Sequence, residues 1–278
     1  MFKRSLVAAL LAVPAAFTVA CGEPEEKERA PIVQELPKLA VPENVVDLSH
    51  AFGPDTIYWP TDTRGFELET LAAGPTEQGY YYAANRFSSA EHGGTHLDAP
   101  IHFYEGRSTA DTIPIERLVG QGVVVDVTEK AHQDPDYQIG VEDFEYWEAL
   151  HGPMPDGVIL LARTGFGRFW PDRSRYLGTD LRGPEAIPEL HFPGLHPDAA
   201  AWLKTERNVK AFGIDTPSID YGQSTTFGSH VTLFEGDIPA FENVANLDVL
   251  PDKDFLVVAL PMKIAGGSGG PLRIIAMW

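Results

Sequence analysis

The segment Glu91-His92-Gly93-Gly94-Thr95-His96-Leu97-Asp98-Ala99-Pro100-Ile101-His102-Phe103 contains three of the nine histidines of this 278-residue chain. Its polar residues follow the spacing H-x-x-x-H-x-D-x-x-x-H. The two glycines and the proline oppose a helix here. In an extended segment, His96, Asp98 and His102 would point to the same side. The pattern therefore predicts that imidazoles and a carboxylate converge.

Imidazole nitrogens and carboxylate oxygens are suitable ligands for Zn²⁺, Mn²⁺ or Fe²⁺. The chain has a single cysteine, which excludes a multi-cysteine zinc or iron–sulfur site. Gly93 and Gly94 would let the backbone approach a bound ion closely. The alternative is a set of unrelated surface or core histidines, but the density of the cluster beside an Asp disfavours it. We predict a metal site within the cluster formed by His92, His96, Asp98 and His102.

Short β-branched and apolar runs bounded by Gly, Pro and Asp predict several strands. These runs cover residues 45–48, 123–127, 158–161, 209–214, 255–260 and 272–276. Helices are expected over residues 141–150 and from Pro197 to about Lys204, because proline favours the first position of a helix. No internal repeat is present, and no shift in composition after residue 44 marks a second domain. The sequence predicts a single domain of the α/β or α+β class, with a mixed β-sheet and flanking helices.

The chain has 40 acidic and 21 basic residues, a formal net charge of −19. This charge argues against binding to nucleic acid, whose phosphates would repel it. The apolar fraction of 44% is ordinary for a folded protein and argues against wholesale disorder.

The N-terminus resembles a secretory signal. Residues 1–20 contain Lys3 and Arg4, followed by an apolar run too short for a comfortable membrane span. Cys21 follows this run as in the lipobox of bacterial lipoproteins, so it is a lipidation candidate; ordinary cleavage would instead leave a free thiol. Residues 21–43 are rich in Pro and Glu and predict a tether, and residues 44–278 form the folded domain. Cleavage changes the net charge to −21, and we expect an extracytoplasmic protein that contacts membrane only through the lipid anchor.

Residues 266–270 match G-x-S-x-G, the pattern of a nucleophile elbow. That elbow requires a following helix, but Pro271-Leu272-Arg273-Ile274-Ile275 is typical of a strand. The α/β-hydrolase order also requires a histidine after the serine, and none follows His230. We therefore predict a glycine-rich hairpin loop at this position. No phosphate-binding glycine motif is present either.

The histidine-rich segment resembles the signature of the cyclase-type metal-dependent hydrolases, a family that includes bacterial kynurenine formamidase and isatin hydrolase. The resemblance extends over residues 44–278. It also rests on Val46-Asp47-Leu48-Ser49-His50, Arg163-Thr164-Gly165, residues 213–220, His230, Glu242 and the glycine-rich ending at 266–273.

The resemblance implies a swivelling β/β/α fold and a site holding one or two ions of Mn or Zn. It implies that His92, His96 and Asp98 bind the metal and that His102 is the acid/base. In one branch Asp98 bridges to a second ion held by His230 and Glu242. In the isatin hydrolase branch a single ion is held, with an oxygen contributed by Gln223.

The implied reaction is hydrolysis of a C–N amide bond in a small aromatic or cyclic amide, and a homodimer or higher homo-oligomer is expected. Candidate substrate-binding residues are Trp59, Phe103, Tyr221 and Ser224, although the last two also suit plain turn residues. Turn capping is an alternative role for Gln223 and Asp220, and the favoured one for Asp215. A lipoprotein that binds a metal or small ligand without turnover is the alternative function.

Overall fold

The computed structural model describes residues 42–278. The predicted signal segment, Cys21 and nearly all of the predicted tether lie outside the described residues. Within residues 42–278, no helix has both the length and the apolar character needed to cross a membrane.

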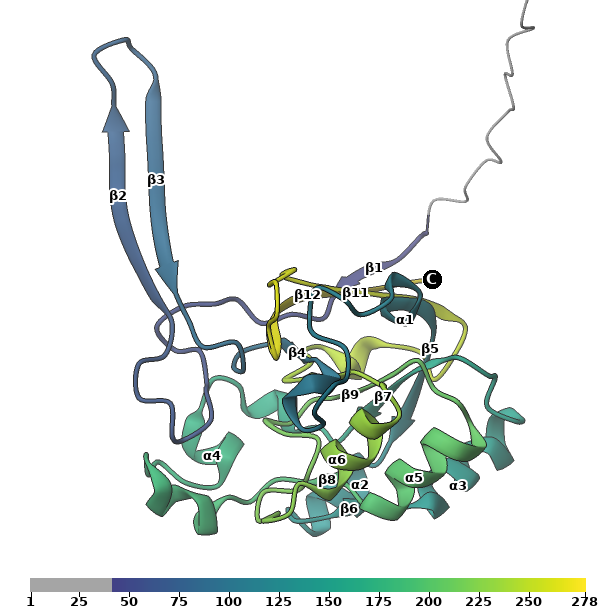
Figure 1. The fold of residues 1–278 in the computed structure, drawn as a ribbon. Helices are drawn as coiled ribbons and strands as arrows, with labels where there is room; N and C mark the ends of the chain where they lie inside the picture. The colour runs from purple at the N-terminus through teal and green to yellow at the C-terminus, as the bar shows by residue number, and fades with distance from the viewer. Residues whose placement is uncertain (1–41) are drawn as a thin grey trace, which may run out of the picture. The chain divides into compact units, whose positions relative to one another are not determined.

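A mixed β-sheet forms the centre of the described part of the chain (Figure 1). Its strands lie in the order β1 (Val45–Asp47), β12 (Gly269–Met277), β11 (Phe255–Pro261), β5 (Val119–Asp126), β7 (Ile159–Arg163), β9 (Ala211–Ile214), β10 (Ala240–Glu242) and β4 (His96–Asp98). Strands β5, β7, β9 and β10 run parallel, and the other pairings are antiparallel. Because β4 also pairs with β12, the sheet closes on itself as a barrel.

The centres of the parallel strands β5, β7 and β9 are apolar runs because both of their faces are buried there. In β5, Val123 and Val125 belong to the core beneath the helices, whereas Val124 belongs to the core inside the barrel. In β7, Leu160 joins the first core and Leu161 the second. The alternation of a strand thus divides one apolar run between two cores.

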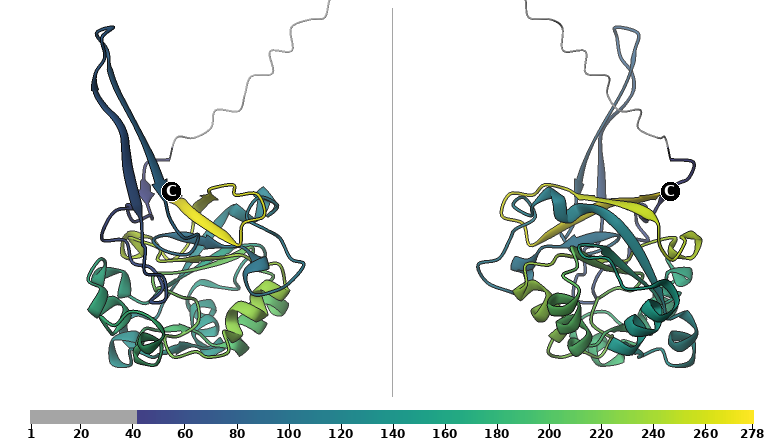
Figure 2. Two further views of the ribbon diagram at one scale, coloured as in Figure 1. Left: turned by 60° about the vertical axis from the view of Figure 1, so that its left-hand side comes forward. Right: turned by 90° about the vertical axis from the view of Figure 1, so that its right-hand side faces the viewer.

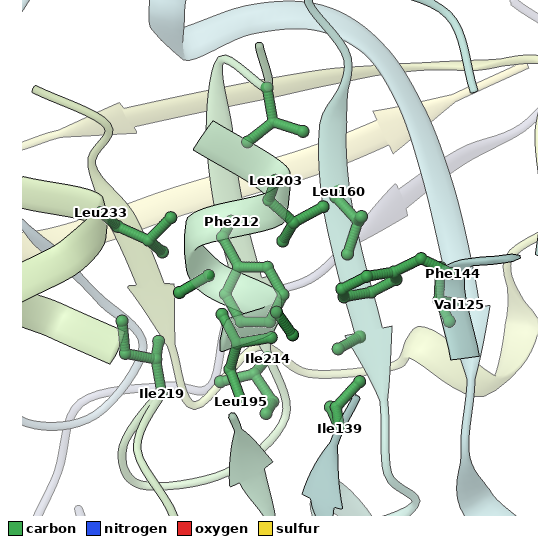
Figure 3. Packing of buried hydrophobic residues seen from close by; sticks show 14 of the residues in the cluster. Val125, Ile139, Phe144, Leu160, Leu195, Leu203, Phe212, Ile214, Ile219 and Leu233 are labelled. Carbon is green, nitrogen blue, oxygen red and sulfur yellow. The ribbon is translucent and has the colours of Figure 1, made fainter. Parts of the chain in front are cut away.

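Three helices cover the outer face of the parallel strands: α3 (Val141–His151), α5 (Pro197–Glu206) and α6 (Gly228–Glu235). Phe144 of α3 and Leu203 of α5 are fully buried against Leu160 and Phe212 of the sheet (Figure 3). Helix α3 begins where the Asp143 carboxylate accepts a hydrogen bond from the Gly140 N–H at 2.8 Å.

The remaining elements are short, apart from one hairpin. They are β6 (Gln138–Ile139), β8 (Gly194–Leu195), α1 (Ile115–Leu118), α2 (Thr128–Gln133), α4 (Arg173–Leu177), and the 3-10 turns η1 (Pro100–His102), η2 (Phe166–Phe169), η3 (Pro184–Glu189) and η4 (Leu247–Val249). Strands β2 (Glu67–Pro75) and β3 (Tyr81–Ser88) pair only with each other. They form a hairpin that projects away from the barrel (Figure 2).

The predicted strands and both predicted helices are confirmed within a few residues, as is the single-domain α/β class with a mixed sheet. Asp215 caps a loop, but a distant one and not its own turn as the sequence favoured: its carboxylate accepts the N–H groups of Thr164 and Gly165 at 2.8 and 2.9 Å. The extended interpretation of the histidine segment was wrong beyond Asp98, because Pro100–His102 forms a 3-10 turn. The β2–β3 hairpin and helix α6 were not predicted.

Candidate metal centre and active site

Strand β4 holds the first part of the site. His96 and Asp98 lie two residues apart and therefore share a face, while Leu97 between them is fully buried in the barrel core. The antiparallel neighbour β10 places Glu242 directly opposite His96. Phe241 of β10 points into the same core as Leu97. One face of two paired strands thus presents an imidazole and two carboxylates.

Helix α6 adds His230 from a distant part of the sequence. Asp220 accepts the backbone N–H groups of Ser229 and His230 at the start of this helix, at 3.0 and 3.2 Å. Its Oδ2 also lies 2.6 Å from Nδ1 of His230. The other ring nitrogen, Nε2, lies 3.1 Å from Asp98 Oδ2 and 3.1 Å from Glu242 Oε1. Asp220 therefore fixes the orientation of a ring that faces two carboxylates.

His92 and His102 form a stacked pair beside Asp98. The Nδ1 atom of His92 lies 2.6 Å from Asp98 Oδ1. The ring of His102 stacks on that of His92, with 3.8 Å between centroids and an interplanar angle of 15°. Turn η1 produces this arrangement because it folds His102 back over the segment that precedes β4.

The described residues fit a divalent cation. They contain two groups of possible ligands, His92–His96–Asp98 and Asp98–His230–Glu242, which share Asp98. The Nε2 atom of His96 is buried without a hydrogen-bond partner, although carboxylate oxygens of Asp98 and Glu242 lie 3.1 and 3.3 Å away. Its Nδ1 lies 2.9 Å from the carbonyl of Gly94, which leaves Nε2 as the atom available to an ion.

The buried carboxylates of the site also favour a bound cation. Burial alone would lower the pKa of His96, but the charges of Asp98 and Glu242 overcome it and raise the pKa to about 10. The pKa of His230 is raised well above its usual value, because hydrogen bonds to Asp220, Asp98 and Glu242 outweigh burial. A bound divalent ion would replace these protons as the counter-charge for the carboxylates.

The pKa of His102 is shifted in the opposite direction. Burial lowers the pKa of His102 to about 4, with the neighbouring Asp98 charge too weak to compensate. Its imidazole is therefore neutral near pH 7 and able to accept a proton.

A cavity of about 240 Å³ opens onto these groups. Its wall combines the ligand candidates with Trp59, Phe103 and Phe227, whose rings lie close together. Phe103 lies 5.0 Å from Phe227 between ring centroids, and Trp59 lies 6.4 Å from Phe227. The cavity suits a small planar apolar molecule with one polar end.

The structure does not bring every predicted residue to this cavity. The amide nitrogen of Gln223 lies 3.1 Å from Nδ1 of His191, and Gln223, Tyr221 and Ser224 are not among the described residues that line the cavity. Ser224 Oγ instead accepts the Phe227 N–H at 3.1 Å. The assigned roles of these three residues stay predictions.

Two expectations about the site need correction or addition. Gly93 and Gly94 have a packing role as well, because a Cβ on them would meet the rings of Tyr58 and Phe52; their role beside an ion stays a prediction. The cavity wall also includes Phe227, which the sequence did not mark, in the left-handed backbone region at φ 48°. This conformation is unusual for an aromatic residue, and no sequence pattern predicts it.

A buried His/carboxylate centre beneath an apolar cavity, with a neutral histidine at its edge, defines a metal-dependent hydrolase. The Cyclase family model matches residues 46–221, and the chain belongs to this family.

Individual relatives agree with that assignment. The chain is 31% identical to the isatin hydrolase of Roseibium aggregatum, over 84% of this chain and 91% of that one. It is 27% identical to the kynurenine formamidase of Salinibacter ruber, over 83% and 96%. Among solved structures, an isatin hydrolase bound to the product analogue thioisatinate superposes with a TM-score of 0.76 at 29% identity, covering 84% of this chain and 92% of that one.

Proposed function

We propose that this protein hydrolyses a C–N amide bond of a small aromatic or cyclic amide, as its isatin hydrolase and kynurenine formamidase relatives do by name. The observation that carries the proposal is that His102, neutral near pH 7, stacks against a ligand candidate in the wall of an apolar cavity. A site that only binds a metal has no use for a buried neutral imidazole that stands beside the ligand candidates without belonging to them. The non-catalytic alternative is therefore not favoured.

Each residue then has a chemical role. A divalent cation held by the two ligand groups supplies polarisation of the substrate carbonyl and a lower pKa for water. His102 accepts a proton from the attacking water and returns it to the leaving nitrogen. Trp59, Phe103 and Phe227 hold the aromatic ring of the substrate and exclude solvent around the reacting carbonyl.

We propose Mn²⁺ or Zn²⁺ as the cation, because both accept imidazole and carboxylate ligands. Two ions fit the sharing of Asp98 between the two groups. A single ion would use His92, His96 and Asp98, and Gln223 would have to leave His191 in order to contribute an oxygen. The swivelling β/β/α fold type also stays a prediction.

Metal removal tests this function. The purified domain is assayed on isatin and on N-formylkynurenine before and after exhaustive chelation, with metal content measured in parallel. We expect turnover of at least one amide, complete loss of turnover on chelation, and recovery with Mn²⁺ or Zn²⁺. Turnover that persists in the metal-free protein would contradict the mechanism, and stoichiometric metal binding without turnover of any amide would favour the non-catalytic alternative.

The remaining proposals concern location and assembly. A cleaved signal at residues 1–20, lipidation at Cys21 and a tether over 21–43 would anchor the domain 44–278 at an extracytoplasmic membrane surface. We also propose a homodimer or higher homo-oligomer. Support for assembly comes from the β2–β3 hairpin, which leaves apolar side chains such as Leu71 and Tyr81 more than half exposed.

A further inference from the structure

The serine of the rejected G-x-S-x-G pattern contacts the metal centre through His92. Ser268 Oγ lies 2.8 Å from His92 Nε2, on the side of the ring opposite Asp98. The same hydroxyl donates to Glu91 Oε2 at 2.6 Å, and the Ser268 backbone N–H donates to that oxygen at 3.0 Å. A chain of contacts thus runs from Glu91 through Ser268 and His92 to Asp98.

The direction of these hydrogen bonds sets the tautomer of His92. A carboxylate only accepts hydrogen bonds, so the single hydroxyl proton of Ser268 is directed to Glu91. The hydroxyl therefore presents a lone pair to His92, and Nε2 must carry the ring proton. Nδ1 is left as the ligand atom, and it is the nitrogen that faces Asp98.

The glycines around Ser268 make this approach possible. A Cβ on Gly269 would lie 2.6 Å from Cε1 of His92, and one on Gly267 would lie 2.8 Å from Oε1 of Glu91. Both distances are shorter than van der Waals contact. The glycine-rich loop therefore lets its backbone pack against the imidazole and the carboxylate.

We infer that Glu91 and Ser268 are positioning residues that hold His92 in the Nε2–H tautomer and direct its Nδ1 at the metal. The inference rests on the proposed function, since it assumes that His92 is a ligand. This inference gives a role to the loop at residues 266–270, which matches the G-x-S-x-G pattern without providing a nucleophile. Ser268 does not attack the substrate, because its hydroxyl proton is held by Glu91 and its lone pair by His92.

Zinc affinity of the intact domain tests this role without using catalysis. Zn²⁺ affinity is measured by competition with a chromophoric chelator for the unsubstituted protein and for Ser268→Ala and Glu91→Gln. We expect Ser268→Ala to weaken zinc binding about 10- to 100-fold, the usual effect of removing an outer-sphere partner of a ligating histidine. Glu91→Gln keeps an acceptor oxygen and should have a smaller effect.

Ser108 supplies a matched control. Its backbone N–H and hydroxyl both donate to the Asp237 carboxylate, at 3.0 and 2.8 Å, but it contacts no ligand candidate. Ser108→Ala should lose comparable thermal stability and keep full zinc affinity. Nitrogen-15 NMR of the zinc-loaded protein should show His92 protonated at Nε2 alone.

Two outcomes distinguish the positioning role of Glu91 and Ser268 from the proposed hydrolase function. Wild-type zinc affinity in Ser268→Ala, or a zinc-loaded His92 protonated at Nδ1, would overturn the positioning role and leave the hydrolase proposal standing. Binding of neither Zn²⁺ nor Mn²⁺ by the unsubstituted protein would overturn both.

Discussion

At the scale of single residues, Asp98 organises the site because each of its oxygens faces a different part of the chain. Oδ1 faces His92 and His96, and Oδ2 faces His230. The local part of this arrangement could be predicted, since a short segment brings its own histidines near its own Asp. The contribution of Asp220 could not, because it depends on a helix that begins beyond a long loop.

His102 is expected to be catalytic without being a metal ligand. His102→Ala should lower kcat on the best amide substrate by about 10²- to 10⁴-fold, the usual contribution of a general acid/base. Bound metal, measured by elemental analysis, should stay at the level of the unsubstituted protein, because neither ligand group includes His102. Loss of metal together with activity would contradict the acid/base assignment.

A second histidine should make stability depend on pH. His50 stacks on Trp170 with 4.2 Å between ring centroids, and its Nε2 is buried without a hydrogen-bond partner. Burial lowers the pKa of His50 to about 4. Since the unfolded chain binds the proton near pH 6.5, the contribution of His50 to stability is fully present above that pH and is lost as pH falls through about 4.

Replacement of this ring isolates the effect. His50→Phe keeps an aromatic ring against Trp170 and removes the titration. The free energy of unfolding, from urea titrations at pH 7 and pH 4.5, should fall by about 2 kcal/mol less in this variant than in the unsubstituted protein. An equal fall in both proteins would contradict the assignment to His50.

At the scale of elements, a strand or helix could be predicted where its own residues carry a pattern typical of that structure. Strands such as β5 and β7 were predicted because their central residues are buried on both faces and must be apolar. Helix α5 was predicted because Pro197 marks its first turn. Helix α6 was missed because Gly228 and β-branched residues weaken its local preference for helix. The missing stabilisation comes from Asp220, which caps the helix, and from burial of Leu233 and Phe234.

The hairpin was missed for a different physical reason. Strands β2 and β3 are exposed along nearly their whole length, so no alternation between a buried and an exposed face marks them. The run Tyr80-Tyr81-Tyr82 adds no such alternation, since all three side chains are more than half exposed. Tyr81 begins strand β3 at the turn end of the hairpin, and this end projects away from the barrel (Figure 1).

At the scale of the whole molecule, the net charge of −19 keeps much of the surface hydrated, but several large apolar side chains are exposed together on the β2–β3 hairpin. Leu71 is 53% and Tyr81 70% exposed. A two-stranded hairpin is only marginally stable by itself in water. A second copy of the chain packed against the hairpin would bury both side chains, which supports assembly through this arm.

Oligomeric state measured by light scattering after gel filtration therefore tests whether the arm formed by β2 and β3 holds two copies of the chain together. The double variant Leu71→Glu/Tyr81→Glu should dissociate to monomers, because burial of two large apolar side chains contributes about 3 kcal/mol, or roughly a hundredfold in affinity. Tyr146→Glu/Leu150→Glu on α3 is the matched control, since these residues are 67% and 62% exposed on the barrel body. It should leave the assembly intact. A monomeric unsubstituted protein, or dissociation by the control variant alone, would show that the arm does not hold two copies together.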